Sequence, residues 1–120
     1  IESEALAGKF HAVLVSRSTV LDSGDAVAYM TADFSSSGSY SMSGLHDEKV
    51  DAAISKAAAT QPGDERHKAI MAAEQAILAS GAAIPLAHER VIQGEAAGVT
   101  GAQRDPGERA LITSATTVKK

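Results

Sequence analysis

Residues 64–86, DERHKAIMAAEQAILASGAAIPL, decide how this sequence is interpreted. Asp64 offers a side-chain oxygen that can begin a helix, and we predict that helix from Glu65 to about Ser80, with Gly81 as its stop. Apolar residues recur in it at helical spacing, which predicts a broad inward face. That face comprises Ile70, Met71, Ala73, Ile77 and Leu78. The charged cluster ERHK at 65–68 is interpreted as a solvated surface with local ion pairs.

Two further helices are predicted ahead of this one. Asp47 caps a helix whose apolar stripe is Val50, Ile54 and Ala57. The second helix is predicted at 26–34, where apolar residues recur at helical spacing. The side-chain oxygens of Asp22, Ser23 and Asp25 precede it and can cap its first turn. Between these helices, residues 35–44 are dominated by serine and glycine, a composition that predicts a mobile loop. At the start of the chain, residues 5–7 followed by Gly8 indicate the last turn of a short helix.

Three apolar, β-branched segments are predicted as strands. They are FHAVLVS at 10–16, AIPLAHERVI at 83–92 and LITSATTV at 111–118. Pro85 cannot donate a ladder hydrogen bond, so the second strand is placed at an edge of the sheet or begins after Pro85. Residues 94–107 are predicted as a loop or a weak hairpin. The fold class expected is therefore α/β, a mixed sheet flanked by helices, and 120 residues suit a single domain over 1–120.

Composition disfavours several classes of function. The net charge is −4, and Lys and Arg are scattered, so no nucleic-acid partner is expected. Cysteine is absent and the four histidines lack ligand spacing, so neither a metal site nor a cofactor is expected. No serine lies in the G-x-S-x-G motif of a nucleophile elbow, and the sequence has no glycine-rich phosphate-binding loop. We predict no catalytic residue and no enzymatic activity, and the apolar runs are too short to span a bilayer.

Two positions stand out as candidate ligand contacts. Arg17 directly follows the first predicted strand and precedes a loop, which is where open α/β sheets present ligand-binding groups. The alternative for Arg17 is a solvated strand end. His88 lies within the second predicted strand and is either a pocket residue or a solubilising group on an edge strand.

Several short motifs follow one another in a fixed order. FHAVLVS leads through Gly24-Asp25-Ala26 to a helix ending in Phe34, and the segment VDAAISKA at 50–57 comes next. Arg66, Ala73-Glu74-Gln75 and Ile77 then precede Ile84-Pro85-Leu86. In this order and spacing the chain resembles the C-terminal lobe of the extracytoplasmic solute-binding proteins of ABC importers, family 5, the peptide, dipeptide and nickel class. The resemblance spans residues 5–101.

The resemblance implies a fold and a function. The fold would be one lobe of a type II periplasmic-binding-protein fold, and this chain would be part of that lobe in a longer, two-lobed protein. The function would be the capture of a peptide or similar small solute outside the membrane, without catalysis. The partners implied are the solute, the permease subunits and the N-terminal lobe of the same protein. The location implied is extracytoplasmic, with any membrane anchor upstream of this chain.

In relatives, the strand end and the following loop contact the solute, which implies ligand contacts at Ser16, Arg17 and Ser18. The segment after I-P-L also lines the cleft, which adds His88. Relatives commonly carry a Trp near the position of Arg17, and a bidentate Arg suits a solute bearing a carboxylate or a phosphate.

A second interpretation belongs to a different functional class. The chain can be a free-standing protein-interaction or regulatory module in which the helix at 65–80 offers the face around Ile70 and Met71 to a partner. The length of the native reading frame separates the two, since a solute-binding protein needs several hundred residues and a secretion signal.

Overall fold

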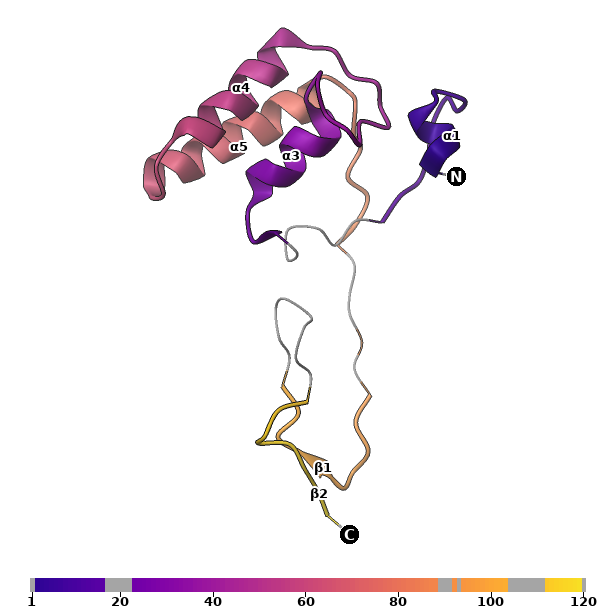
Figure 1. Cartoon of the computed structure of the whole chain (residues 1–120), viewed down its shortest axis with the longest axis vertical. Helices are drawn as coiled ribbons and strands as arrows, with labels where there is room; N and C mark the ends of the chain where they lie inside the picture. The colour runs from indigo at the N-terminus through magenta and orange to yellow at the C-terminus, as the bar shows by residue number, and fades with distance from the viewer. Residues whose placement is uncertain (1, 17–22, 89–91, 93, 104–111, 120) are drawn as a thin grey trace.

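The computed structural model describes residues 2–16, 23–88, 92, 94–103 and 112–119. In chain order its regular elements are α1 (Glu2–Leu6), α3 (Ala26–Phe34), α4 (Glu48–Ala59), α5 (Asp64–Ala79), β1 (Val99–Thr100) and β2 (Thr117–Val118). Helices α3, α4 and α5 pack together, and β1 and β2 lie away from them (Figure 1). We call α3, α4 and α5 the three-helix unit.

Helices α4 and α5 form an antiparallel hairpin because the chain reverses at residues 60–63 (Figure 1). Asp47 caps α4 as predicted, since its Oδ1 accepts hydrogen bonds from the N–H groups of Lys49 and Val50. Helix α5 begins one residue earlier than predicted, because Gly63 occupies its N-cap. Gly81 follows its end at a φ of 75°, which confirms the predicted stop.

The apolar core lies between the three helices. From α4 it takes the predicted stripe, Val50, Ile54 and Ala57, and from α3 it takes Val27 and Met30. Helix α5 contributes Ala69, Ala73 and Ile77. Ala57 and Ala73 are fully buried, so their small side chains let α4 and α5 approach closely. The predicted inward face of α5 was therefore partly wrong: Met71 and Leu78 are 51% and 41% exposed.

The expectation of a mixed α/β sheet flanked by helices, as in a type II binding-protein lobe, was wrong. The described residues are mostly helical, and their sheet consists of β1 and β2 alone, paired antiparallel with Val99 opposite Val118. Residues 12–16 and 83–88 form no strand. Of the third predicted strand, only Thr117–Val118 is one, and residue 111 lies outside the described residues.

The physical reason lies in main-chain pairing. A strand exists only where a neighbouring strand accepts and donates main-chain hydrogen bonds, and an apolar run cannot supply that neighbour by itself. Of the described residues in these runs, Ala83 alone packs against the core of the three-helix unit. Leu14 and Ile84 are each 80% exposed as a result.

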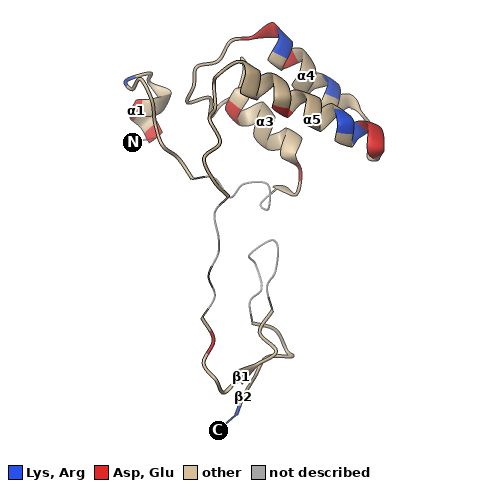
Figure 2. Cartoon of the chain, turned by 180° about the vertical axis from the view of Figure 1, so that it is seen from behind, with Lys and Arg blue, Asp and Glu red and all other residues tan. Residues whose placement is uncertain are grey.

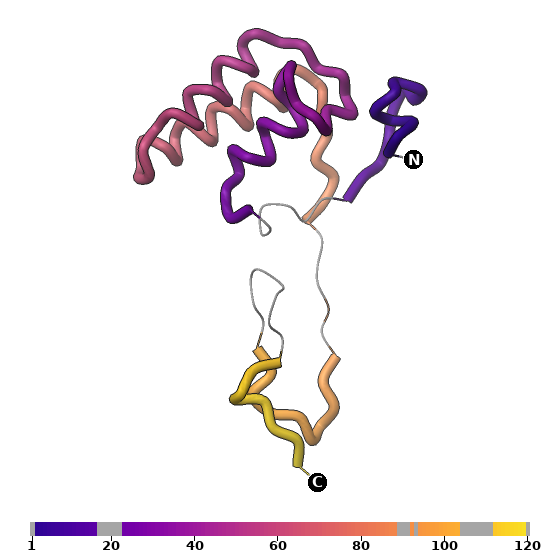
Figure 3. Tube along the Cα trace, viewed as in Figure 1, coloured from indigo at the N-terminus to yellow at the C-terminus, as the bar shows by residue number. Residues whose placement is uncertain are grey.

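The chain as a whole is elongated. Its radius of gyration is 18.4 Å, against about 14 Å for a compact chain of 120 residues. The tube in Figure 3 shows the reason: the three-helix unit occupies one end and the β1–β2 ribbon the other. At the N-terminus, α1 ends before Gly8, whose φ of 67° confirms the predicted helix end.

Candidate functional site

Two of the four predicted ligand contacts can be located. Ser16 and His88 are both exposed, and each lies in a segment without regular secondary structure. Arg17 and Ser18 lie outside the described residues. The structure therefore describes two of the four predicted ligand contacts, Ser16 and His88.

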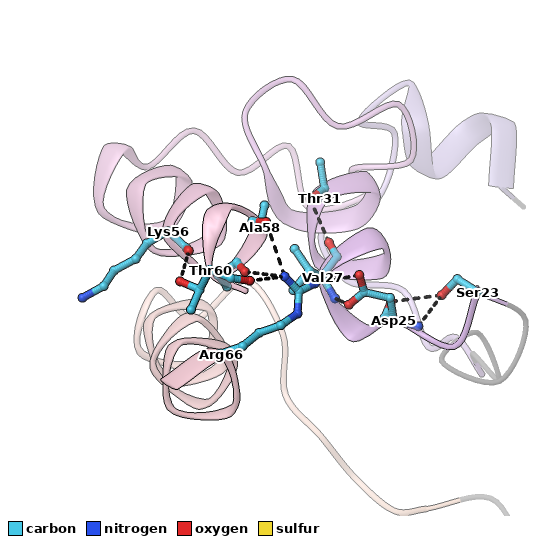
Figure 4. A network of polar contacts seen from close by, with 9 residues as sticks. Ser23, Asp25, Val27, Thr31, Lys56, Ala58, Thr60 and Arg66 are labelled. Atoms are coloured by element: carbon cyan, nitrogen blue, oxygen red, sulfur yellow. Dashed lines mark hydrogen bonds and ion pairs between the residues drawn. The ribbon is translucent and has the colours of Figure 1, made fainter. Parts of the chain in front are cut away.

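The best-defined polar centre of the described chain is instead at Arg66 (Figure 4). Its Nη1 donates hydrogen bonds to the carbonyl oxygens of Ala57 and Thr60, both at 2.9 Å, and of Ala58 at 3.3 Å. Its Nη2 lies 2.8 Å from Oδ2 of Asp25 and forms an ion pair with it. Arg66 thereby binds the free carbonyls at the end of α4 and the residue that caps α3.

Asp25 is the partner from α3. Its Oδ1 accepts a hydrogen bond from the N–H of Val27 at 3.0 Å, which makes Asp25 the N-cap of α3, one of the three residues predicted to offer a capping oxygen. The hydrogen bond from Val27 is the main cause of a lowered pKa of the Asp25 carboxyl; burial opposes it, and the Arg66 guanidinium lowers the pKa further. Asp25 therefore stays ionised and holds the guanidinium.

The prediction for the ERHK cluster was right for one pair and wrong for Arg66. Lys68 pairs with Glu65 at 2.7 Å on the exposed surface, as expected of a solvated face. The side chain of Arg66 is only 19% exposed, because it turns from α5 toward α3 and the end of α4. Sequence analysis missed this contact because Arg66 and Asp25 are 41 positions apart. The available signal was the unsatisfied C-terminal carbonyls of the preceding helix, which attract a nearby cation.

An open hollow of about 480 Å³ lies beside this centre. Its walls come from α3, the serine-rich loop, the end of α4 and α5. The polar groups that line it are those of Asp25, Thr31, Ser37, Ser39 and Arg66. Four of these already have partners: Thr31 donates to the carbonyl of Val27, Asp25 and Arg66 bind one another, and the hydroxyls of Ser37 and Ser35 lie 3.4 Å apart. Most polar groups of the hollow are therefore engaged in contacts within the three-helix unit and its loop.

The serine-rich loop at 35–44 is anchored, although its composition predicts mobility. The N–H of Ser36 donates to Oδ1 of Asp51 on α4 at 2.8 Å. Ser35 is buried, and its hydroxyl donates to the carbonyl of Thr31. Hydrogen bonds from Ser36, with a contribution from the charge of His46, lower the pKa of the Asp51 carboxyl.

A second hollow, of about 580 Å³, lies on the outer face of α5. Met71, Leu78, Glu74 and Gln75 line it together with His67 and Lys68. Figure 2 shows both basic and acidic residues on α4 and α5, and the lining of this hollow includes one of each, Lys68 and Glu74. Ile70, the other residue of the predicted docking face, packs against the core instead.

Two further findings concern the described ranges alone. They contain no group of three or more His, Cys, Asp or Glu side chains placed to hold a metal ion. None of the helices described has both the length and the apolar character needed to cross a membrane.

Comparison with known proteins gives no match: no protein-family model, no curated protein and no solved structure is significantly similar to this chain.

Proposed function

We propose that this chain is part of a non-catalytic solute-binding component of an ABC uptake transporter, which captures a peptide or similar small solute outside the membrane. The observation that carries the proposal is the order of motifs along the chain: VDAAISKA at 50–57, Arg66, Ala73-Glu74-Gln75 and Ile84-Pro85-Leu86. The helices of the structure support it, since α3, α4 and α5 coincide with the motif segments that are helical in the family. The proposal does not include the mixed sheet.

The contacts to the solute belong to Ser16, Arg17, Ser18 and His88 in this proposal. Ser16 and His88 are exposed, as a ligand contact requires before binding. Arg17 supplies a positive charge and a planar set of donors, so the solute it favours carries a carboxylate or a phosphate. The remaining wall of the site comes from the N-terminal lobe, and the loaded protein delivers its solute to the permease.

The experiment begins with the full-length protein purified from its source cells. Mass spectrometry identifies the solute that co-purifies, and calorimetry then measures the dissociation constant of that solute. We expect Arg17→Ala to weaken binding about tenfold to a hundredfold, the worth of a lost charge-assisted hydrogen bond. Lys9→Ala is the matched control, because it removes the same charge from an exposed position and leaves binding unchanged. An unchanged constant for Arg17→Ala removes Arg17 from the site, and a full-length protein without any bound or transported solute contradicts the proposal.

One observation favours the alternative, a protein-interaction or regulatory module. Met71 and Leu78 are exposed on the outer face of α5 and line its hollow. A native reading frame of several hundred residues with a secretion signal supports the transporter, whereas a short native frame supports the module. Met71→Lys distinguishes them further, since it leaves solute binding intact and abolishes function only if the outer face of α5 docks a partner.

A further inference from the structure

Two aspartate side chains connect α3 to the rest of the three-helix unit, one at each end of the helix. Asp25 caps the N-terminus of α3 and pairs with Arg66 of α5 at 2.8 Å. Asp51 of α4 accepts a hydrogen bond at 2.8 Å from the N–H of Ser36, which follows the C-cap of α3. We call these the two carboxylate contacts.

The apolar contact between the two ends is small. Helix α3 contributes only Val27 and Met30 to the buried core, with Phe34 packed at its margin. Two of its other buried positions, Asp33 and the C-cap Ser35, are polar. By contrast, the α4–α5 hairpin contributes six buried apolar residues: Val50, Ile54, Ala57, Ala69, Ala73 and Ile77. The attachment of α3 therefore depends more on polar contacts than the α4–α5 interface does.

We propose that α3 is a detachable element, which opens away from the α4–α5 hairpin as a unit when the two carboxylate contacts are lost, before the hairpin itself unfolds. Cooperative units of this kind open at free energies below that of global unfolding. Opening exposes the faces of α4 and α5 that Val27 and Met30 cover. The inference concerns the three-helix unit alone and is independent of the proposed function.

Acid is the natural trigger, because protonation removes the charge by which Asp25 pairs with Arg66 and weakens the oxygen of Asp51 as an acceptor for the Ser36 N–H. The charged group facing Asp25 is Arg66 of α5, and the titratable group facing Asp51 is His46 in the segment before α4. Asp33 is a third carboxyl group on α3 and makes an interaction of its own. The pKa values of Asp25 and Asp51 are both lowered, so the contacts persist through neutral pH and are lost only in acid.

Two substitutions each remove one carboxylate contact and leave the other interactions of the three-helix unit in place. Asp25→Asn removes the charge that binds Arg66 but leaves a capping oxygen for Val27, since Asn and Asp cap equally well. Asp51→Ala removes the acceptor for Ser36 and improves the helix propensity of α4. Asp64→Asn is the control, because Asp64 is an exposed carboxylate in the first turn of α5.

The measurement is amide hydrogen exchange of the chain at neutral pH, followed by NMR. In the native chain we expect the opening free energy of α3 to be lower than that of Ile54 and Ala73 in the α4–α5 hairpin, because the hairpin opens only after α3 has detached. We expect each of the two variants to accelerate exchange in the last turn of α3 by about twofold to fivefold, and the double variant by more, whereas Asp64→Asn leaves exchange in α3 unchanged. Equal opening free energies for α3 and the α4–α5 hairpin overturn the proposal, as does the absence of acceleration in α3.

The unmodified chain provides a second test that needs no variant to fold. Protection factors are measured between pH 7 and pH 3, each corrected for the intrinsic exchange rate. Loss of protection in α3 at a higher pH than in α4 and α5 supports the proposal, whereas simultaneous loss in all three helices overturns it.

Discussion

Replacing Arg66 by alanine removes every contact of the polar centre at once, so its effect can be worked out from the geometry. The ion pair with Asp25 is worth about 0.5–1 kcal/mol, because the Asp25 side chain is 43% exposed and solvent screens the pair. The donors to the carbonyls of Ala57, Ala58 and Thr60 are charged but partly solvated, and together contribute roughly 1.5 kcal/mol. We therefore expect Arg66→Ala to lower the free energy of unfolding by about 2 kcal/mol.

Urea denaturation followed by far-ultraviolet circular dichroism measures this loss. At a slope of about 1–2 kcal/mol per molar urea, the midpoint falls by roughly 1–2 M. Arg66→Lys keeps the charge, but a lysine ammonium cannot reach the carboxylate and the carbonyls together, so we expect about half of the loss.

A double-mutant cycle separates the stability that Arg66 gains from its ion pair with Asp25 from the stability that it gains from hydrogen bonds to the carbonyls of α4 and Thr60. Asp25→Asn in the native background costs at most about 1 kcal/mol, and in the Arg66→Ala background it costs close to nothing. The reasoning is refuted if Arg66→Ala is as stable as the native chain, or if Asp25→Asn alone costs as much as Arg66→Ala.

Three further predictions concern the core, the response to acid and the serine-rich loop. Ile54→Ala, at a buried position of α4, is expected to cost about 2–5 kcal/mol in urea denaturation, whereas Ile84→Ala, at a position 80% exposed, stays within about 0.5 kcal/mol; equal losses would contradict the assigned core. The folded-state pKa values of Asp25 and Asp51 lie below their unfolded values, so their contribution to stability is complete above about pH 4 and is lost as the pH falls through the folded pKa values. Urea midpoints in a pH series should therefore fall more steeply below about pH 4 in the native chain than in Asp25→Asn, and parallel curves would contradict this origin. Gly38→Ala places a methyl carbon against the carbonyl oxygens of Ala32 and Thr31, so the loop must shift, and the NMR signals of Ser36 and Tyr40 should move; an unchanged spectrum would contradict the packing.

The three helices could be predicted because their signals are local. Asp25 and Asp47 cap the helices that follow them, and Val50, Ile54 and Ala57 lie at helical spacing. Such features act within a few residues of chain and depend little on the rest of the fold. The inward face of α5 was harder, because size alone favours Met71 and Leu78. The close approach of α4 and α5 favours small side chains there: Ala73 was predicted and is buried, whereas Ala69 is buried and was not predicted.

The strands and the polar centre could not be predicted in the same way. An apolar run such as FHAVLVS shows that a segment can be a strand, but only a pairing partner makes it one, and sequence periodicity does not identify that partner. The contacts of Arg66 could not be predicted for the same reason, because its partners are distant in the sequence. Its neighbours in sequence suggest an ordinary surface cluster, while its actual partners are the end of α4 and Asp25, brought together by the fold.

The central structural claim is that the described chain is built around a three-helix unit and not around a mixed sheet. Backbone chemical shifts and nuclear Overhauser effects, measured by NMR on the chain, test it most directly. We predict helical shifts over α3, α4 and α5, contacts between Ile54 and Ala73 across the α4–α5 hairpin, and no cross-strand contacts from residues 12–16 or 83–88. Strand-type shifts with cross-strand contacts in those two segments would contradict the account.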